Sequence, residues 1–249
     1  MITLPDDIAT TEHLLVWFMG HFSRIFKGSA ILKGGMVLRL MECPRSTNDL
    51  DILFVPFKSK KEVFPAFKKA ITQIRDIDCS FHMDSKCFRC IVRYRQLTVQ
   101  VEGTVATSCE SEAMSTAPLV RGTTLQPALV AVQKREIALA HKLATWNERQ
   151  LMRDLYDIYF FVSVLDVLPE KNVLAQRLQN VFQGRVNKST EMTMEAFCQK
   201  LDACRQNLSQ DQLQAELRPI VNEMELPGLA PRIKTALHRV LRDLRALDS

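Results

Sequence analysis

Two aspartates, Asp49 and Asp51, stand at the start of an apolar segment, LDILFV, whose composition is typical of a β-strand. Side chains two residues apart on a strand lie on the same face, with Cα atoms about 6.6 Å apart at ~3.3 Å per residue. Carboxylates at that spacing repel each other, and a divalent cation with oxygen ligands relieves the repulsion. Nucleotidyl transfer uses such cations on the attacking and leaving oxygens. A solvated acidic strand end would look the same, so the pair alone leaves both interpretations open.

A glycine pair, Gly34 and Gly35, comes before these aspartates, where the chain enters a short helix predicted over residues 35–41. Glycine lets the backbone approach a phosphate closely, and the start of a helix offers free N–H groups and a favourable dipole. A tight turn with no ligand is the alternative interpretation of a single Gly-Gly.

A third carboxylate is expected from a neighbouring strand, because a two-metal site usually uses three. The segment LTVQVEG, residues 97–103, alternates apolar and polar side chains and puts Glu102 on the polar face. That strand could lie beside the two aspartates, which makes Glu102 a candidate for the third carboxylate. An exposed glutamate at a strand end is the alternative. Weaker candidates lie in less regular sequence: Glu110, Glu112 and Asp84.

A long predicted helix supplies the second charged cluster. Helical spacing puts one apolar stripe on this helix and four charged residues on its opposite side. The charged residues are Lys142, Arg149, Arg153 and Asp157, and the stripe comprises Ala140, Ala144, Leu151, Leu155, Ile158 and Val162. A solvated charged face is the alternative interpretation, although Trp146 falls inside that face and would be costly to expose.

The first cluster resembles a known family. K-G-G-x-x-L-R followed by R-S-x-x-D-L-D is similar to the first motif of the AbiEii/AbiGii toxin nucleotidyltransferases, which belong to the DNA polymerase β-like superfamily. Met36 and Val37 stand where that family often has threonine and alanine, which could alter phosphate contacts. The matching positions are Lys33, Gly34, Gly35, Leu38, Arg39, Arg45, Ser46, Asp49, Leu50 and Asp51.

The second cluster resembles the helical motif of the same toxins. Its matching positions are Lys142, Thr145 (where alanine is common), Arg149, Arg153, Asp154, Tyr156, Asp157 and Tyr159. The resemblance implies that Lys142 contacts the phosphates of an NTP and that Asp157 or Asp154 supports the active centre. Arg149 and Arg153 would hold phosphates or pair with these aspartates.

The same resemblance implies a set of ligands and partners. Asp49, Asp51 and Glu102 would hold Mg²⁺ or Mn²⁺, and an NTP would be the substrate. Lys33, Gly34, Gly35, Arg45 and Ser46 would contact the nucleotide. The family also implies a type IV toxin, often encoded beside an antitoxin, and tRNA is the favoured acceptor because related toxins act on tRNA acceptor ends.

The elements that must position these residues suggest an α+β fold in two parts. Residues 1–120 are expected to form a nucleotidyltransferase α/β domain with a mixed sheet, in the order helix, helix, strand, helix, strand, strand. Thr10 and Thr11 are expected to cap the first helix, Pro65 to lie in the first turn of the third, and Arg95 and Gln96 to join the last two strands. Residues 121–249 are expected to form a helical domain that contributes the lysine and aspartate helix to an active-site cleft. Its helices are predicted over 129–164, 170–182, 194–207, 210–222 and 231–247, with a loop over 184–190.

The composition of the chain limits the class of protein but does not indicate a function. The chain has 249 residues, a net charge of +5 and 47% hydrophobic residues, which suits a globular protein and permits an anionic partner. Seven cysteines without regular spacing do not suggest a disulfide framework, and Cys87 and Cys90 form only half of a zinc site. No stretch approaches the ~20 apolar residues of a membrane span, so no membrane partner is expected and the cytoplasm is the expected location.

Two other functions fit the same clusters. A nucleotidyltransferase that modifies a small molecule, such as an aminoglycoside, would need an acidic acceptor pocket in the helical half. A non-catalytic nucleotide-binding protein that keeps the fold is the third hypothesis, although intact Asp49, Asp51 and Lys142 count against it. The basic helix predicted over 231–247 is expected to pack its leucines and expose its arginines, with RNA contact as the alternative.

Overall fold

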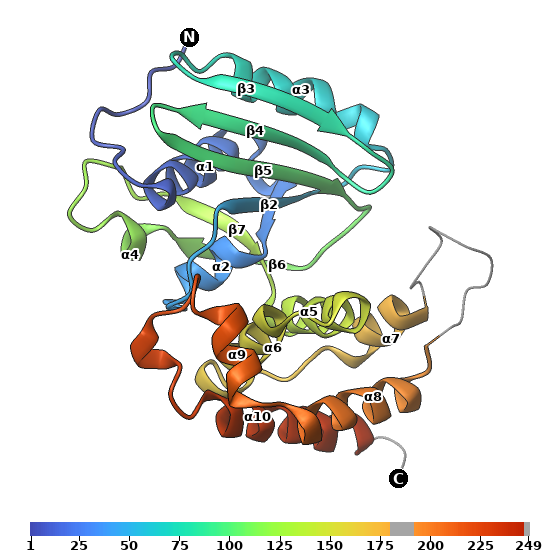
Figure 1. The fold of residues 1–249 in the computed structure, drawn as a ribbon. Coiled ribbons are helices and arrows are strands. Elements are labelled where there is room, and N and C mark those ends of the chain that lie inside the picture. The colour runs from blue at the N-terminus through green and yellow to red at the C-terminus, as the bar shows by residue number, and fades with distance from the viewer. Residues whose placement is uncertain (180–191, 247–249) are drawn as a thin grey trace. The chain divides into compact units, whose positions relative to one another are not determined.

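A computed structural model of the chain describes residues 1–179 and 192–246 (Figure 1). The chain divides into two compact units, Met1–Gln133 and Lys134–Ser249, which we call the sheet unit and the helical unit. The division lies C-terminal of the boundary expected near residue 120, because a further strand completes the sheet after that point. The predicted α+β class, a mixed sheet followed by a helical region, is confirmed.

One seven-stranded sheet, in the order β3-β4-β5-β2-β1-β7-β6, forms the frame of the sheet unit. The pairs β2–β5 and β1–β7 are parallel, and the other pairs are antiparallel. The strands are β1 (Ala30–Lys33), β2 (Asp49–Phe54), β3 (Asp78–Met83), β4 (Phe88–Tyr94), β5 (Leu97–Val105), β6 (Ser111–Ser115) and β7 (Leu129–Gln133). The predicted hairpin of two strands joined at Arg95 and Gln96 is therefore present as β4 and β5.

Four α-helices and a short 3₁₀ turn accompany the sheet: α1 (Thr11–Phe26), η1 (Lys27–Ser29), α2 (Gly35–Leu40), α3 (Lys60–Thr72) and α4 (Ala117–Val120). Figure 1 shows α1 and α3 on the same face of the sheet. Phenylalanine rings from these helices and from three strands meet there, with centroids 4.8 Å apart for Phe67 and Phe88 and 5.5 Å apart for Phe22 and Phe67. This face of the sheet therefore carries the hydrophobic core.

Helix α1 begins as its sequence predicts. Thr10 is the N-cap, and its hydroxyl accepts a hydrogen bond from the backbone N–H of His13 at 3.1 Å. Later in the helix, the buried ring of His21 stacks on Trp17 and donates from Nε2 to the carbonyl of Ala70 at 2.8 Å. Burial lowers the pKa of His21 below its ordinary value, so the neutral ring is favoured in the folded chain.

Helix α3 departs from the prediction at Pro65. The sequence predicts the proline in the first turn, but Ser59 caps the helix and places Pro65 in the second turn. Because proline has no N–H, the carbonyl of Lys61 lacks its usual intrahelical partner there.

Four strands of the sheet were not predicted from the sequence: β1, β3, β6 and β7. The most consequential is β7, because the sequence predicts a single helix over 129–164. Ala131 and Val132 instead pair in parallel with Ile31 and Leu32 of β1, about 100 residues earlier in the chain. Short strands of this kind are stabilised by distant partners, so local periodicity does not reveal them.

The remainder of that predicted helix is also interrupted. It forms α5 (Arg135–Arg149), α6 (Met152–Tyr159) and a π-helical turn, η2 (Phe160–Val164). Gln150 ends α5 in the left-handed conformation, at φ 52°, and the chain turns before α6 begins. The single-helix prediction was therefore wrong.

The other helices of the helical unit are α7 (Lys171–Gln179), α8 (Met194–Asn207), α9 (Gln210–Leu217), η3 (Glu223–Glu225) and α10 (Leu229–Arg245). The helix predicted over 194–207 is confirmed, whereas α9 ends at Leu217 rather than at residue 222. The loop predicted over 184–190 and the predicted helix ends at residues 182 and 247 lie outside the described residues. None of the helices in the described ranges is both long enough and apolar enough to cross a membrane.

Candidate active site

Strand β2 carries the two aspartates on the face opposite the core. Leu50, Ile52 and Phe54 are fully buried, and the alternation of a strand turns Asp49 and Asp51 to the other side. Both aspartates are half-buried, so their carboxylates remain accessible. The expectation that the D-x-D pair lies on one face of a strand is confirmed.

Strand β5 lies parallel to β2 and places Glu102 beside these aspartates. Asp51 pairs in register with Glu102, and Asp49 pairs with Gln100. Neighbouring strands are about 4.8 Å apart, and side chains in register share a face. The predicted pairing of Glu102 with the D-x-D strand is confirmed, whereas its role in holding a metal stays a prediction.

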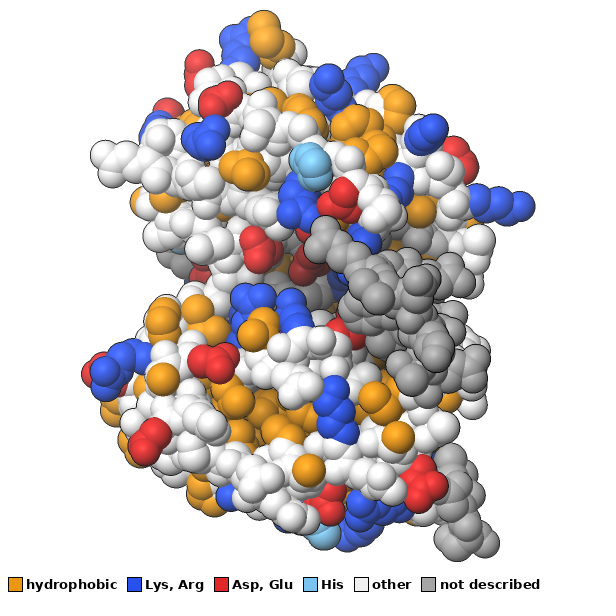
Figure 2. All heavy atoms as spheres, turned by 45° about the vertical axis from the view of Figure 1, so that its right-hand side comes forward, with side chains coloured by type: hydrophobic (Ala, Val, Ile, Leu, Met, Phe, Trp, Pro, Cys, Tyr) orange, Lys and Arg blue, Asp and Glu red, His pale blue; other side chains and the backbone are white. Residues whose placement is uncertain are grey.

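A charged row crosses the sheet at this level. Lys33 of β1 pairs with Asp51, Asp51 with Glu102, and Glu102 with Arg89 of β4. We call these four residues the charged row. Its two carboxylates lie between two cations, and Nη2 of Arg89 is 3.8 Å from Oε2 of Glu102. In the upper half of Figure 2, acidic and basic side chains likewise lie next to each other on the sheet unit.

Gly34 lies against the carboxylate of Asp51. Its φ is +75° and its ψ −152°, a conformation that essentially only glycine adopts. A Cβ atom at Gly34 would lie 2.1 Å from Oδ2 of Asp51. The glycine turn and the aspartate strand are thus packed together without room for any side chain, which a simple solvent-exposed turn would not require.

Gly35 is restricted in a similar way by the segment before β2. A Cβ atom there would lie 2.8 Å from Oγ1 of Thr47 and 3.1 Å from Nη2 of Arg45. Arg45 is buried, and its Nη1 donates to the carbonyl of Ser46 at 3.1 Å. Ser46 itself is exposed. The structure therefore brings the predicted nucleotide-binding residues of the sheet unit together around the start of α2.

The donor set suits a hard divalent cation, but the described residues do not form a complete metal site by themselves. No three His, Cys, Asp or Glu side chains in the described ranges gather closely enough to hold a metal ion. Mg²⁺ is usually bound by one or two carboxylates together with waters and substrate phosphates. The oxygen donors of Asp49, Asp51 and Glu102 fit that pattern, so an NTP would have to complete the coordination. The same absence gives no support to zinc at Cys87 and Cys90.

The second predicted cluster forms a buried ion network within the helical unit. Asp154 and Asp157 are both fully buried. Nζ of Lys142 is 2.6 Å from Oδ2 of Asp157 and 3.6 Å from Oδ1 of Asp154. Arg149 donates to Asp154 through Nε and Nη2, each at 2.7 Å. The interpretation as a solvated charged face is wrong for Asp157, which is fully buried, and for Lys142, whose side chain is only 16% exposed, whereas Arg149 is exposed.

Other members of the predicted charged face have different environments. Arg153 is exposed, whereas Trp146 is buried and lies beneath the ammonium of Lys200 at 5.8 Å. The side chain of Lys142 is 16% exposed, so its ammonium still meets solvent while it bridges the two aspartates. The network thus joins α5 to α6 and holds Lys142 in one position.

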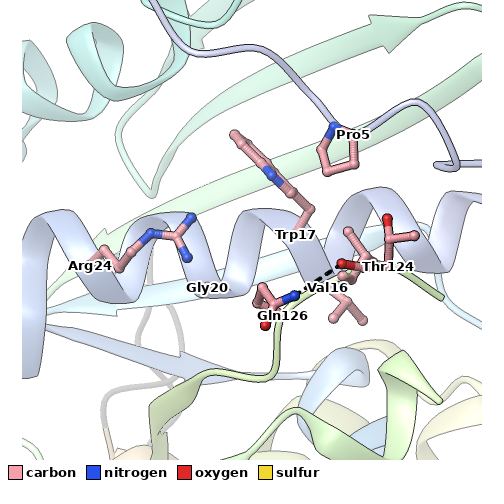
Figure 3. A pocket seen from close by; sticks show the side chains of 8 residues that line it. Pro5, Val16, Trp17, Gly20, Arg24, Thr124 and Gln126 are labelled. Carbon is pink, nitrogen blue, oxygen red and sulfur yellow. Dashed lines mark hydrogen bonds between the residues drawn. The ribbon is translucent and has the colours of Figure 1, made fainter.

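Two cavities in the sheet unit contain, among the candidate site residues, only Glu112, one of the weaker carboxylate candidates, which lines the second. One of about 170 Å³ lies between α1 and two loop segments, with Trp17, Arg24 and Gln126 among its lining residues (Figure 3). The other, of about 420 Å³, is lined by α1, η1, β6 and β7. The four residues of the charged row are each half-buried on the sheet.

Sequence reasoning missed Arg89. The alternation of FRCIVRY puts Arg89 on the same polar face as Arg93, opposite buried Cys90 and Val92, and could have indicated it. Its position next to Glu102 depends on the register between two strands, which the sequence alone does not show.

Comparison with known proteins identifies the family. A family model described as nucleotidyl transferase AbiEii toxin, type IV TA system, matches residues 17–239. The chain belongs to this family. It is therefore a nucleotidyltransferase-family enzyme and a toxin of the type IV class, and the family implies an NTP as substrate. The predicted resemblance is confirmed. Among curated proteins, no sequence matches the chain significantly.

Solved structures show the same fold as this AbiEii family member. MenT4, a nucleotidyltransferase toxin from Mycobacterium tuberculosis, superposes with a TM-score of 0.66 at 18% identity, over 94% of this chain and 84% of MenT4. JHP933 from Helicobacter pylori gives a TM-score of 0.56 at 17% identity, over 98% of this chain and 96% of JHP933. At these identities the likeness establishes the fold, including both the sheet and the helical parts.

Proposed function

We propose that this chain transfers a nucleotide from an NTP to a hydroxyl of tRNA, with release of pyrophosphate, at the charged row of the sheet unit. The observation that supports this most strongly is the register that places Asp51 beside Glu102 while the same Asp51 packs against Gly34. One strand arrangement thereby places the Asp51 and Glu102 carboxylates next to each other beside a glycine turn, with Asp49 two residues away on the same face of β2. Catalysis of nucleotidyl transfer needs carboxylates and phosphate-binding groups in this proximity.

The proposed roles in the sheet unit follow from this geometry. Asp49, Asp51 and Glu102 would hold Mg²⁺, or Mn²⁺, which supplies positive charge to the attacking and leaving oxygens when bound. Gly34 and Gly35 leave the backbone open to the triphosphate. Lys33, Arg45 and Ser46 are proposed to contact its oxygens. Arg45 would do so only in part, because one of its N–H groups is already bonded to the backbone.

The helical unit is proposed to contribute Lys142 to the phosphates. A lysine there would stabilise the charge that develops on the leaving pyrophosphate. Asp157 and Asp154 are proposed as positioning residues, since they hold the Lys142 ammonium through ion pairs. Arg149 is largely committed to Asp154 by two hydrogen bonds, whereas the exposed Arg153 is available for a phosphate.

The terminal helix α10 does not strengthen the case for RNA. Several of its arginines bond within the helical unit: Arg232 donates to the carbonyl of Glu225 at 2.6 Å, and Arg239 pairs with Asp166 at 2.6 Å. These two arginines are partly exposed, as expected, but also bonded within the unit. The preference for tRNA rests on the family resemblance, as does a cognate antitoxin, which we propose as a partner.

The test is transfer of label from each α-³²P NTP to total tRNA with Mg²⁺. We expect labelled tRNA with one or more nucleotides for the wild type and none for Asp51→Asn. Asp78→Asn is a matched control, because Asp78 is an exposed acid on the same sheet, and it should behave as wild type. Label in neither tRNA nor any other RNA would contradict the proposed acceptor. Transfer to a small molecule, or nucleotide binding without catalysis, would then be the better explanation.

A further inference from the structure

Arg89 extends the charged row on the side away from the glycine turn. From Asp51, the strand order leads through β1 to Gly34 in one direction and through β5 to β4 in the other. Glu102 lies one strand away and Arg89 two strands away, or about 5 and 10 Å at ~4.8 Å per strand. The two cationic ends of the row, Lys33 and Arg89, therefore flank the carboxylates from opposite sides.

The guanidinium of Arg89 is only partly used within the protein. Its Nη2 is 3.3 Å from Oδ2 of Asp84, 3.1 Å from Sγ of Cys87 and 3.8 Å from Oε2 of Glu102. Its Nε is buried and has no hydrogen-bond partner among the described residues. An arginine has five N–H donors, and a buried donor without a partner is costly. The side chain is 35% exposed, so its N–H donors other than the buried Nε can reach a bound molecule.

The two sides of the charged row correspond to the leaving group and the attacking hydroxyl of the proposed reaction. In nucleotidyl transfer the attacking and leaving oxygens are in line on opposite sides of the α-phosphorus. The glycine turn at Gly34 and Gly35 is the proposed side of the leaving pyrophosphate. The attacking hydroxyl must then approach from the opposite side, where Glu102 and Arg89 lie.

We infer that Arg89 binds an anionic group of the acceptor, next to the hydroxyl that attacks. This inference rests on the proposed function and adds a residue that recognises the acceptor. A guanidinium fork matches a phosphodiester well, so the acceptor is a hydroxyl compound with a phosphate close to the reacting oxygen, such as the end of an RNA strand. A polycationic acceptor of the aminoglycoside type would meet like charge at this position.

A purely structural role for Arg89 makes different predictions. Asp84 already accepts hydrogen bonds from the backbone N–H groups of Lys86 and Cys87, at 2.7 and 2.9 Å, which closes the turn between β3 and β4. If Arg89 only braced that turn, its loss would lower stability without changing the affinity for one substrate over the other. If it acted only through Glu102, the turnover rate would fall and the KM for tRNA would not rise selectively.

The experiment measures transfer of label to total tRNA while tRNA and NTP are varied separately. For Arg89→Ala we expect the KM for tRNA to rise about 10- to 100-fold, the effect of one lost hydrogen bond to a charged group. The KM for NTP should stay within about twofold of the wild type. Arg89→Lys, which keeps the charge, should recover part of the loss. Since one phosphate contact is removed, the salt dependence of tRNA binding should also weaken, by about one unit of slope.

Arg93→Ala is the matched control. Arg93 lies on the same face of β4, four residues from Arg89, and pairs with exposed Asp78 at 3.1 Å, so its loss should change neither KM. An Arg89→Ala variant that folds and transfers with an unchanged KM for tRNA, or with a raised KM for NTP instead, overturns the inference alone. A wild-type protein that transfers nothing to tRNA contradicts the proposed function and this inference together.

Discussion

Substitution of Gly34 by alanine should disable the site through Asp51. The backbone at Gly34 has φ +75° and ψ −152°, and an added Cβ would lie 2.1 Å from Oδ2 of Asp51. Real Cβ atoms are not found that close to an oxygen, so the carboxylate or the turn must move. A catalytic group displaced by about 1 Å can cost about 100-fold in rate. We therefore expect Gly34→Ala to lose at least about 100-fold in nucleotidyl transfer.

The same substitution also strains the backbone, and that contribution can be separated. A residue forced into this region costs about 1–3 kcal/mol, which corresponds to about 2–12 °C in the unfolding temperature of a domain of this size. Gly228 is a matched control, because it has φ +67° but a Cβ added there would have no other atom within 4 Å. Gly228→Ala should lower the unfolding temperature by a few degrees and leave transfer unchanged. Wild-type activity in a folded Gly34→Ala protein would refute the reasoning.

Three further predictions concern the ion network, the metal and pH. Asp157→Ala should lower the free energy of unfolding, measured in urea, by about 3 kcal/mol. This is the low end for breaking a buried ion pair, because Asp154 remains 3.6 Å from Lys142. A decrease of less than about 1 kcal/mol would contradict the buried pairing. Mn²⁺ binding, followed by electron paramagnetic resonance, should be weak for the protein alone and at least about tenfold tighter with a non-hydrolysable NTP. The Asp51→Asn variant should not show this increase in affinity. Tight Mn²⁺ binding without nucleotide would instead show that the protein supplies all the metal ligands. Burial lowers the pKa of His21, so the folded chain resists protonation of this ring. The contribution of His21 to the free energy of unfolding should therefore be greatest above about pH 6.5 and should fall, by up to about 1.4 kcal/mol per pH unit, as the pH drops below that value. If thermal unfolding of His21→Gln shows the same dependence on pH as the wild type, His21 is excluded as the cause.

Local sequence patterns were enough to predict the strands that carry the candidate site carboxylates. The alternation in LDILF and LTVQVEG has a period of two, so it assigns Asp49, Asp51 and Glu102 to polar faces without knowledge of partners. The cap at Thr10 and the hairpin at Arg95 are equally local features. These elements follow from residues within a few positions of one another, which is why the sequence identifies them.

Features that depend on distant partners were not predictable in the same way. Strand β7 is stable because it pairs with β1, and its five residues read locally as the start of a helix. The break between α5 and α6 at the left-handed residue Gln150 has no strong local signal, since glycine or asparagine would be more usual there. The burial of Asp154 and Asp157 also depends on packing that local sequence does not show. The place of Arg89 beside Glu102 likewise required the register of two strands.

The central claim is that the carboxylates of the charged row catalyse nucleotidyl transfer, and its most direct test is the stoichiometry of the reaction. Pyrophosphate released from NTP and nucleotide added to tRNA would be counted in the same samples, for the wild type and for Asp51→Asn. The proposed function predicts one pyrophosphate per nucleotide added by the wild type, and neither product from a folded Asp51→Asn protein. Transfer by Asp51→Asn at the wild-type rate, or pyrophosphate release with no nucleotide added to RNA, would contradict it.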